Sequence, residues 1–171
     1  MTDPIDDFVA SGVQRYAEAQ STVTFFRDRV FDILDSALKE ALKDGFSTLD
    51  EAPEIRRSND GGVTECWITL YANVVLNTKP VPRKTRIELG VWWNPVLDKK
   101  KAACVVYANF RDDDRQVAVF DLPPDSNSRV RAMPSPKWTR VCVTVDSPPS
   151  LRQDALDVIE VLRAGVEART G

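Results

Sequence analysis

The chain of 171 residues has 43% hydrophobic and 29% charged residues, a composition typical of globular proteins that excludes a disordered polypeptide. A chain of this length can bury a core without help from disulfides or a metal. The net charge of −3 is unevenly spread: residues 1–60 hold 13 acidic and 7 basic residues, whereas residues 61–140 hold 8 acidic and 13 basic ones. The acidic and basic parts either attract each other weakly, or the basic part offers a face to an acidic partner.

No apolar run is long enough to cross a membrane, and the N-terminal sequence lacks the basic and apolar stretches of a secretory signal. We therefore expect a soluble, cytoplasmic protein that does not associate with a membrane. The three cysteines, Cys66, Cys104 and Cys142, each lie in an apolar, strand-like run. An odd number of cysteines in such positions predicts buried free thiols rather than a disulfide framework.

Two helices are predicted at the N-terminus, over residues about 4–19 and 22–44. Ser21 or Thr22 can cap the second helix, and Gly45 suits the position just past its end. The second helix has the stronger amphipathic pattern, with apolar residues three and four positions apart.

Between residues 46 and 145 the apolar period changes from 3.6 to 2, which predicts strands. The clearest strands are residues 63–77 and 85–93, in which apolar and polar side chains alternate. Residues 122–136 are predicted to be a loop. The other predicted strands are residues 46–51, 102–110, 117–120 and 138–145.

A last helix is predicted over residues about 150–168, with Ser150 and Gln153 as a capping box. The strands follow one another without helices between them, which favours antiparallel neighbours over βαβ units. We therefore predict one α+β domain over residues 1–171. Its antiparallel meander sheet of about six strands carries the N-terminal helices and the C-terminal helix on one face.

The chain contains no histidine, which excludes catalytic triads built on imidazole and zinc sites built on histidine. Its seven glycines form neither of the common phosphate-binding loops. The three aspartates at 112–114 are predicted to form a solvated turn, because adjacent side chains point in different directions. Glu88 with Asp98 and the following lysines leaves a metal-dependent nuclease formally open. We expect no cofactor and no metal, and we favour a non-enzymatic protein.

The sheet face away from the helices is the surface that the sequence marks for binding. Aromatic and arginine side chains alternate with core residues there, a combination typical of interaction surfaces. The alternative is that other segments cover these aromatics, which then form a second small core; a shift of one residue in strand register would also reverse the faces. The candidate partner-binding residues, including two arginines from the adjacent loop, are Trp67, Tyr71, Arg86, Trp92, Arg129, Arg131, Trp138 and Arg140.

Two functions stay open on these residues. The first is a non-catalytic binding or regulatory protein that holds a macromolecular partner, expected to be another protein, through this basic and aromatic face or the adjacent loop. The second is a histidine-independent enzyme, or a ligand- or nucleic-acid-binding protein, that uses carboxylates and arginines. The acidic pI of about 5.1 limits the second to weak nucleic-acid binding. The sequence predicts neither the identity of the partner nor the oligomeric state.

Overall fold

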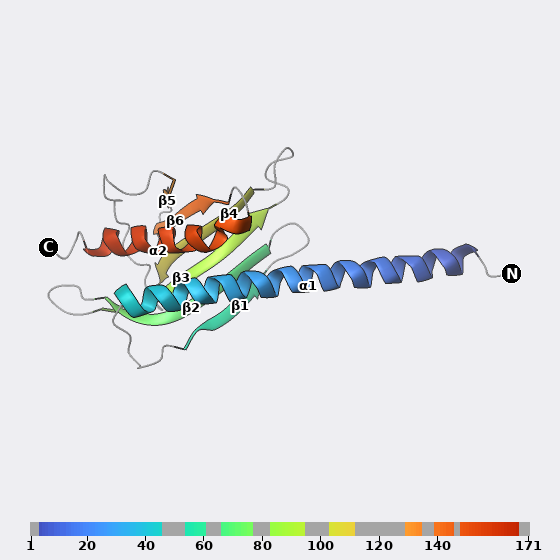
Figure 1. The fold of residues 1–171 in the computed structure, drawn as a ribbon, viewed down its shortest axis with the longest axis horizontal. Coiled ribbons are helices and arrows are strands. Elements are labelled where there is room, and N and C mark those ends of the chain that lie inside the picture. The colour runs from blue at the N-terminus through green and yellow to red at the C-terminus, as the bar shows by residue number, and fades with distance from the viewer. Residues whose placement is uncertain are drawn as a thin grey trace.

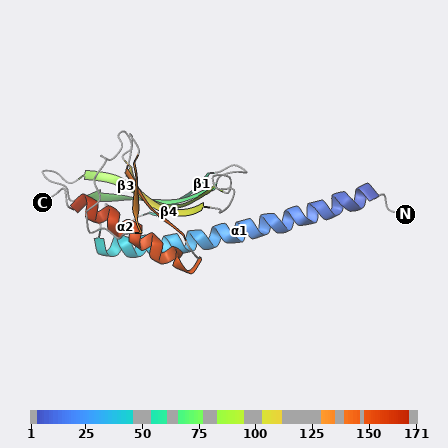
Figure 2. The same ribbon diagram turned by 90° about the horizontal axis from the view of Figure 1, so that it is seen from above.

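The fold is an antiparallel sheet with both helices on one side (Figures 1 and 2). The computed structural model describes residues 4–45, 54–60, 66–76, 83–94, 103–111, 129–134, 139–145 and 148–167. The sheet has six strands in the order β1-β2-β3-β4-β6-β5, which confirms the predicted α+β class. No helix within these ranges is both long and apolar enough to cross a membrane. The elements are α1 (Pro4–Gly45), β1 (Arg56–Asp60), β2 (Cys66–Leu76), β3 (Arg83–Asn94), β4 (Ala103–Arg111), β5 (Arg131–Pro134), β6 (Thr139–Thr144), a 3₁₀ turn (Pro148–Ser150) and α2 (Leu151–Glu167).

The N-terminal part of the chain forms one continuous helix, so the predicted division into helices at 4–19 and 22–44 is wrong. Thr22, expected to cap the second helix, lies inside α1 and donates a hydrogen bond of 2.9 Å from its hydroxyl to the carbonyl of Glu18. Bonding back to the preceding turn is how a helix accommodates threonine. The result is a 42-residue helix, of which only the C-terminal part lies on the sheet (Figure 2).

Two of the six strands differ from the prediction, and both are edge strands. β1 is a run of polar residues without apolar alternation, so its sequence carries no strand period. β5 has only four residues and lies inside the segment 122–136, which was predicted to be a loop. That prediction is therefore wrong for residues 131–134. The predicted strands at 46–51 and 117–120 lie outside the described residues.

The core lies between the sheet and the two helices. The register aligns Leu70 of β2 with Leu89 of β3 and Ala108 of β4, and all three are fully buried against the helices. The alternation predicted for 63–77 and 85–93 is thereby confirmed for the described residues, as the period of two in a strand requires. In α1 the buried residues begin only at Val30. An ion pair between Glu40 of α1 and Arg152 of α2 links the two helices.

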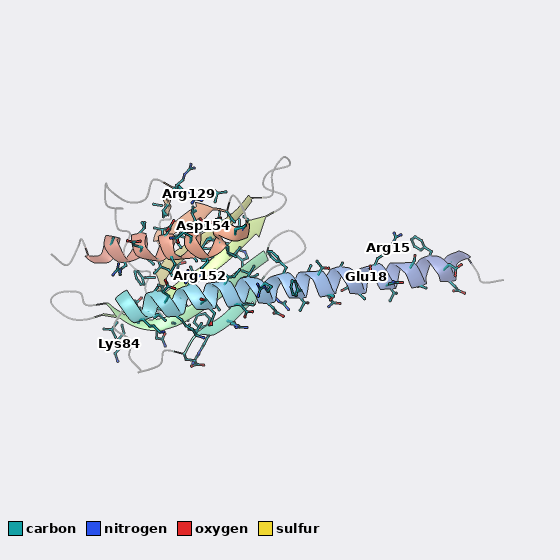
Figure 3. The ribbon with its side chains drawn as sticks, in the orientation of Figure 1. Arg15, Glu18, Lys84, Arg129, Arg152 and Asp154 are labelled. Atoms are coloured by element: carbon teal, nitrogen blue, oxygen red, sulfur yellow. The ribbon has the colours of Figure 1, made fainter. Side chains whose placement is uncertain are left out.

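A buried carboxylate anchors the start of α2 (Figure 3). The Asp154 side chain is 0% exposed and accepts a 2.6 Å hydrogen bond from the Ser150 hydroxyl. Its other oxygen lies 3.2 Å from a guanidinium nitrogen of Arg129. Because a buried carboxylate is costly without partners, Arg129 ties the segment before β5 to α2.

Candidate functional site

The sheet face opposite the helices gathers aromatic and charged side chains from four neighbouring strands. The backbone register aligns Trp67 with Trp92, Thr69 with Tyr107 across Gly90, and Tyr71 with Arg140 across β3 and β4. Every second residue of a strand points to the same face, so these rows lie side by side. We call the following residues the open face: Trp67, Thr69, Tyr71, Arg86, Glu88, Trp92, Tyr107, Asn109 and Arg140.

Three aromatic rings and one arginine form a cluster on the open face. The rings of Trp67 and Trp92 are stacked, with centroids 5.0 Å apart and an interplanar angle of 18°. The ring of Tyr107 meets Trp67 edge to face at 5.8 Å. The guanidinium carbon of Arg140 lies 4.3 Å from the Tyr107 centroid and 5.2 Å from the Trp67 centroid. Stacking and cation–π contacts of this kind hold large side chains in fixed positions before any partner binds.

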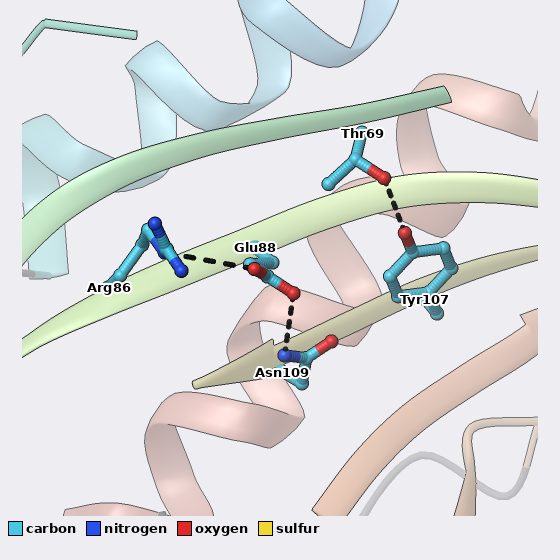
Figure 4. Close-up of polar contacts among 5 residues, drawn as sticks. All are labelled: Thr69, Arg86, Glu88, Tyr107 and Asn109. Atoms are coloured by element: carbon cyan, nitrogen blue, oxygen red, sulfur yellow. Dashed lines mark hydrogen bonds and ion pairs between the residues drawn. The ribbon is translucent and has the colours of Figure 1, made fainter. Parts of the chain in front are cut away.

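Gly90 makes room for this arrangement at the centre of the sheet. A Cβ atom at Gly90 would lie 2.6 Å from the Ile68 carbonyl oxygen and 2.6 Å from the Tyr107 ring and hydroxyl. The absence of a side chain thus lets Tyr107 lie across β3 and reach Thr69 on β2. The two hydroxyls are 2.6 Å apart and share a hydrogen bond (Figure 4). Three strands are therefore joined across one glycine.

A polar group continues the open face beyond Tyr107 (Figure 4). Glu88 accepts a 3.1 Å hydrogen bond from the Asn109 amide nitrogen and lies 3.7 Å from the Arg86 guanidinium. The guanidinium carbon of Arg86 also lies 5.0 Å from the ring centroid of Tyr71. Glu88, the single carboxylate among the residues of the open face, is therefore hydrogen-bonded and ion-paired to neighbouring side chains.

Polar side-chain atoms of Trp92 and Asn109 are buried without a hydrogen-bond partner. They are the indole nitrogen of Trp92, a donor, and the side-chain oxygen of Asn109, an acceptor. Asn109 is only 4% exposed. Buried polar atoms are nearly always bonded, so the open face has an unused donor and an unused acceptor.

The centre of the open face is buried and its rim is exposed. Tyr107 is 3% exposed, whereas Asn73 and Lys84 at the rim are exposed to solvent. Burial raises the pKa of the Tyr107 phenol and lowers the pKa of the Arg140 guanidinium. An arginine keeps its charge despite such a shift, so the face remains positive.

Glu88 is the carboxylate of the open face that could act as an acid or a base. The chain has no histidine, and Glu88 is held by Asn109 and Arg86. Within the segments that the structure describes, no three cysteine, aspartate or glutamate side chains come together as a possible metal site. Asp98 and the following lysines, considered for a nuclease, lie outside those segments.

Five of the eight predicted binding residues meet on the open face: Trp67, Tyr71, Arg86, Trp92 and Arg140. Arg131 lies at the edge, aligned with Cys142 and therefore in the row of Tyr107. Arg129 is elsewhere, beside Asp154 at the start of α2, and Trp138 lies outside the described residues.

The prediction missed Tyr107 and Asn109, which supply the hydroxyl bridge and the unused acceptor. A signal for both was present, because they alternate in β4 with the buried residues Val106, Ala108 and Phe110.

Comparisons with protein-family models, with curated proteins and with solved structures give no match to this chain.

Proposed function

We propose that the chain is a non-catalytic binding protein that holds an acidic segment of another protein against the open face. A cytoplasmic location is part of this proposal, supported by the free thiols of Cys104 and Cys142. The observation that carries the proposal is the cluster of Trp67, Trp92, Tyr107 and Arg140, which is already stacked in fixed positions. Tryptophan, tyrosine and arginine are the residues most enriched among binding hot spots.

Charge supports an acidic partner. The described side chains of this face and its rim include five basic residues, Arg56, Lys84, Arg86, Arg131 and Arg140, against two carboxylates, Glu88 and the Glu54 that is paired with Arg56. Glu88 is already paired with Arg86, so the net positive charge is concentrated at the rim. Complementary charge of this kind guides an acidic segment to the face and fixes its orientation.

The proposal can be tested with a display library of random peptides selected on the full chain. We expect the selected peptides to be rich in acidic and apolar residues. Fluorescence anisotropy with a synthetic copy of a selected peptide should show affinity at least about tenfold lower for Arg86→Ala. Trp92→Ala, which removes the ring stacked on Trp67, should also weaken binding.

Arg57→Ala is the matched control. Arg57 lies 5.2 Å from the ring centroid of Phe31, much as Arg86 lies over Tyr71, but it belongs to the helix side of the sheet. Far-UV circular dichroism and urea unfolding establish that each variant is folded. The proposal is contradicted if the selected peptides are not enriched in acidic and apolar residues. It is also contradicted if Arg86→Ala and Arg57→Ala lose affinity equally.

A nucleic-acid-binding or enzymatic function is the second candidate, and the geometry favours it less. Trp67 already has Trp92 stacked on its ring and Arg140 beside it, which leaves little ring surface for a base. A gel shift with single-stranded DNA or RNA at low salt tests the nucleic-acid version. Cleavage that requires a divalent ion and is lost in Glu88→Ala would favour an enzyme.

A further inference from the structure

The N-terminal part of α1 extends away from the sheet (Figures 1 and 2). We call residues 4–29 the arm, because burial in α1 begins only at Val30. At 1.5 Å per residue the arm is about 39 Å long. Every described side chain from Ile5 to Phe26 is exposed, and the large apolar ones are Ile5, Phe8, Val9, Val13, Tyr16, Val23, Phe25 and Phe26.

Most of these apolar residues continue the stripe with which α1 contacts the sheet. Residues eighteen positions apart point in the same direction, because they are separated by about five turns of 3.6 residues. Val13 therefore points like the buried Phe31, and Tyr16 points like the fully buried Leu34. Phe8 and Phe26 share a direction in the same way. The stripe on the arm consists of Ile5, Phe8, Val9, Val13, Tyr16, Val23 and Phe26.

Helices in proteins gain most of their stability by packing an apolar face, and the described arm packs none of its apolar face. Contiguous exposed apolar surface marks an interaction site. The arm also lacks the features of a membrane-surface helix. The arm carries no lysine, and its four acidic residues, Asp6, Asp7, Glu18 and Asp28, outnumber its three arginines. Helices that lie on anionic membranes are rich in basic residues on their polar side.

We propose that the arm pairs in antiparallel orientation with the arm of a second copy of this chain. Charge along the helix selects this orientation. In a parallel pair Asp6 would lie beside Asp6 of the second copy. An antiparallel pair with full overlap places it near Arg27, which points like Val9 and lies at the stripe itself. Arg15 then lies near Glu18 of the second copy, and both side chains are on the arm, clear of the sheet (Figure 3). Pairs of opposite charge that flank an apolar stripe determine orientation in coiled coils.

The available area fits a stable dimer. Phe8, Tyr16 and Phe26 can each bury about 150–250 Å², and the four aliphatic residues add to this. Each copy can therefore approach the roughly 800 Å² per partner of a standard interface. The antiparallel arrangement also keeps the two sheets at opposite ends of the paired arms, so they do not collide. The inference is independent of the proposed function, because the arm and the open face are separate surfaces.

Sedimentation equilibrium of the full chain over a concentration series tests the pairing. We expect a dimer at micromolar concentration, and a dissociation constant at least about tenfold higher for Phe8→Glu and for Tyr16→Glu. Both residues are exposed in one copy, at 78% and 70%, so neither substitution should unfold the body. Phe25→Glu is the matched control, because Phe25 is 69% exposed on the same arm but points away from the stripe. The control should leave the dissociation constant unchanged.

Disulfide trapping tests the orientation. Tyr16 lies near the centre of the overlap, so Tyr16→Cys should form a disulfide-linked dimer under mild oxidation. Ile5→Cys should not, because antiparallel pairing separates the two cysteines by roughly 35 Å at 1.5 Å per residue. A monomer at all concentrations, a dimer equally weakened by Phe25→Glu, or efficient trapping at position 5 overturns the proposal. Binding of a monomer to phosphatidylglycerol vesicles through the stripe would also overturn it.

Discussion

Gly90→Ala should destabilise the protein, although alanine is ordinarily the better residue in the middle of a strand. Replacing glycine by alanine at an unobstructed strand position stabilises by roughly 0.5–1 kcal/mol, because the unfolded chain loses freedom. At Gly90 the new Cβ would lie 2.6 Å from the Ile68 carbonyl oxygen and from the ring and hydroxyl of Tyr107. Real Cβ atoms do not approach other atoms so closely, so the neighbours must move.

The size of the destabilisation depends on which neighbours of the new Cβ must move. The Ile68 oxygen belongs to the backbone of β2, which is paired on both sides and cannot shift freely. Overpacking of this kind costs about 1–3 kcal/mol. Displacing Tyr107 also weakens its hydrogen bond with Thr69, which contributes about 0.5–1.5 kcal/mol. After the favourable term for alanine is subtracted, we expect a net loss of about 1–3 kcal/mol in the free energy of unfolding.

Urea unfolding followed by far-UV circular dichroism measures this loss. A double-mutant cycle with Tyr107→Leu identifies its cause, because leucine lacks the ring that the new Cβ meets. Gly90→Ala should cost less in the Tyr107→Leu background, with a coupling energy above about 0.5 kcal/mol. Part of the cost should remain, since the Ile68 carbonyl is unchanged. Additive effects, or a Gly90→Ala variant as stable as the original chain, would refute the reasoning.

The remaining predictions concern two other buried groups. Arg129→Met should lower the free energy of unfolding by about 1–3 kcal/mol, because it leaves the buried Asp154 carboxylate without its cation. Arg152→Met breaks an exposed ion pair with Glu40 and should lower it by less than about 1 kcal/mol. Urea unfolding of the two variants compares these losses. Burial, aided by the Asp154 carboxylate, raises the pKa of Cys104 from about 9 to about 11. The unfolded chain therefore releases this proton first, so stability should fall as the pH rises from about 9 to about 11, and Cys104→Ala should flatten that part of the stability curve. An unchanged slope in Cys104→Ala would contradict the assignment.

The sequence predicts the centre of the sheet well because strand alternation there depends only on local pattern. Residues such as Ile68, Leu70 and Leu89 alternate with polar or aromatic neighbours, and one buried face is enough to fix their direction. The edge strands β1 and β5 lack that pattern, and they exist because a neighbouring strand offers backbone hydrogen bonds. The sequence also predicted that Thr22 could cap a helix. Threonine can equally donate a hydrogen bond to a carbonyl of the preceding turn inside a helix, as Thr22 does to Glu18.

The candidate site is less predictable than the sheet because it depends on alignment between strands distant in sequence. Trp67 and Trp92 can be assigned to one face from their own strands, but their stacking needs the register of β2 with β3. Tyr107 joins them only because Gly90 leaves space on the intervening strand. A single sequence does not specify that a tyrosine will lie opposite a glycine seventeen residues earlier in the chain.

The open face and the arm differ in how their apolar groups are held, which suggests different modes of binding. The rings of Trp67, Trp92 and Tyr107 contact one another and Arg140, so this surface is ordered before a partner arrives. Surfaces that are already ordered spend little free energy on binding and can exchange partners reversibly. The apolar side chains of the arm are exposed, so the proposed pairing would add to the stability of their helix. We therefore expect the arm to be occupied continuously and the open face to bind and release.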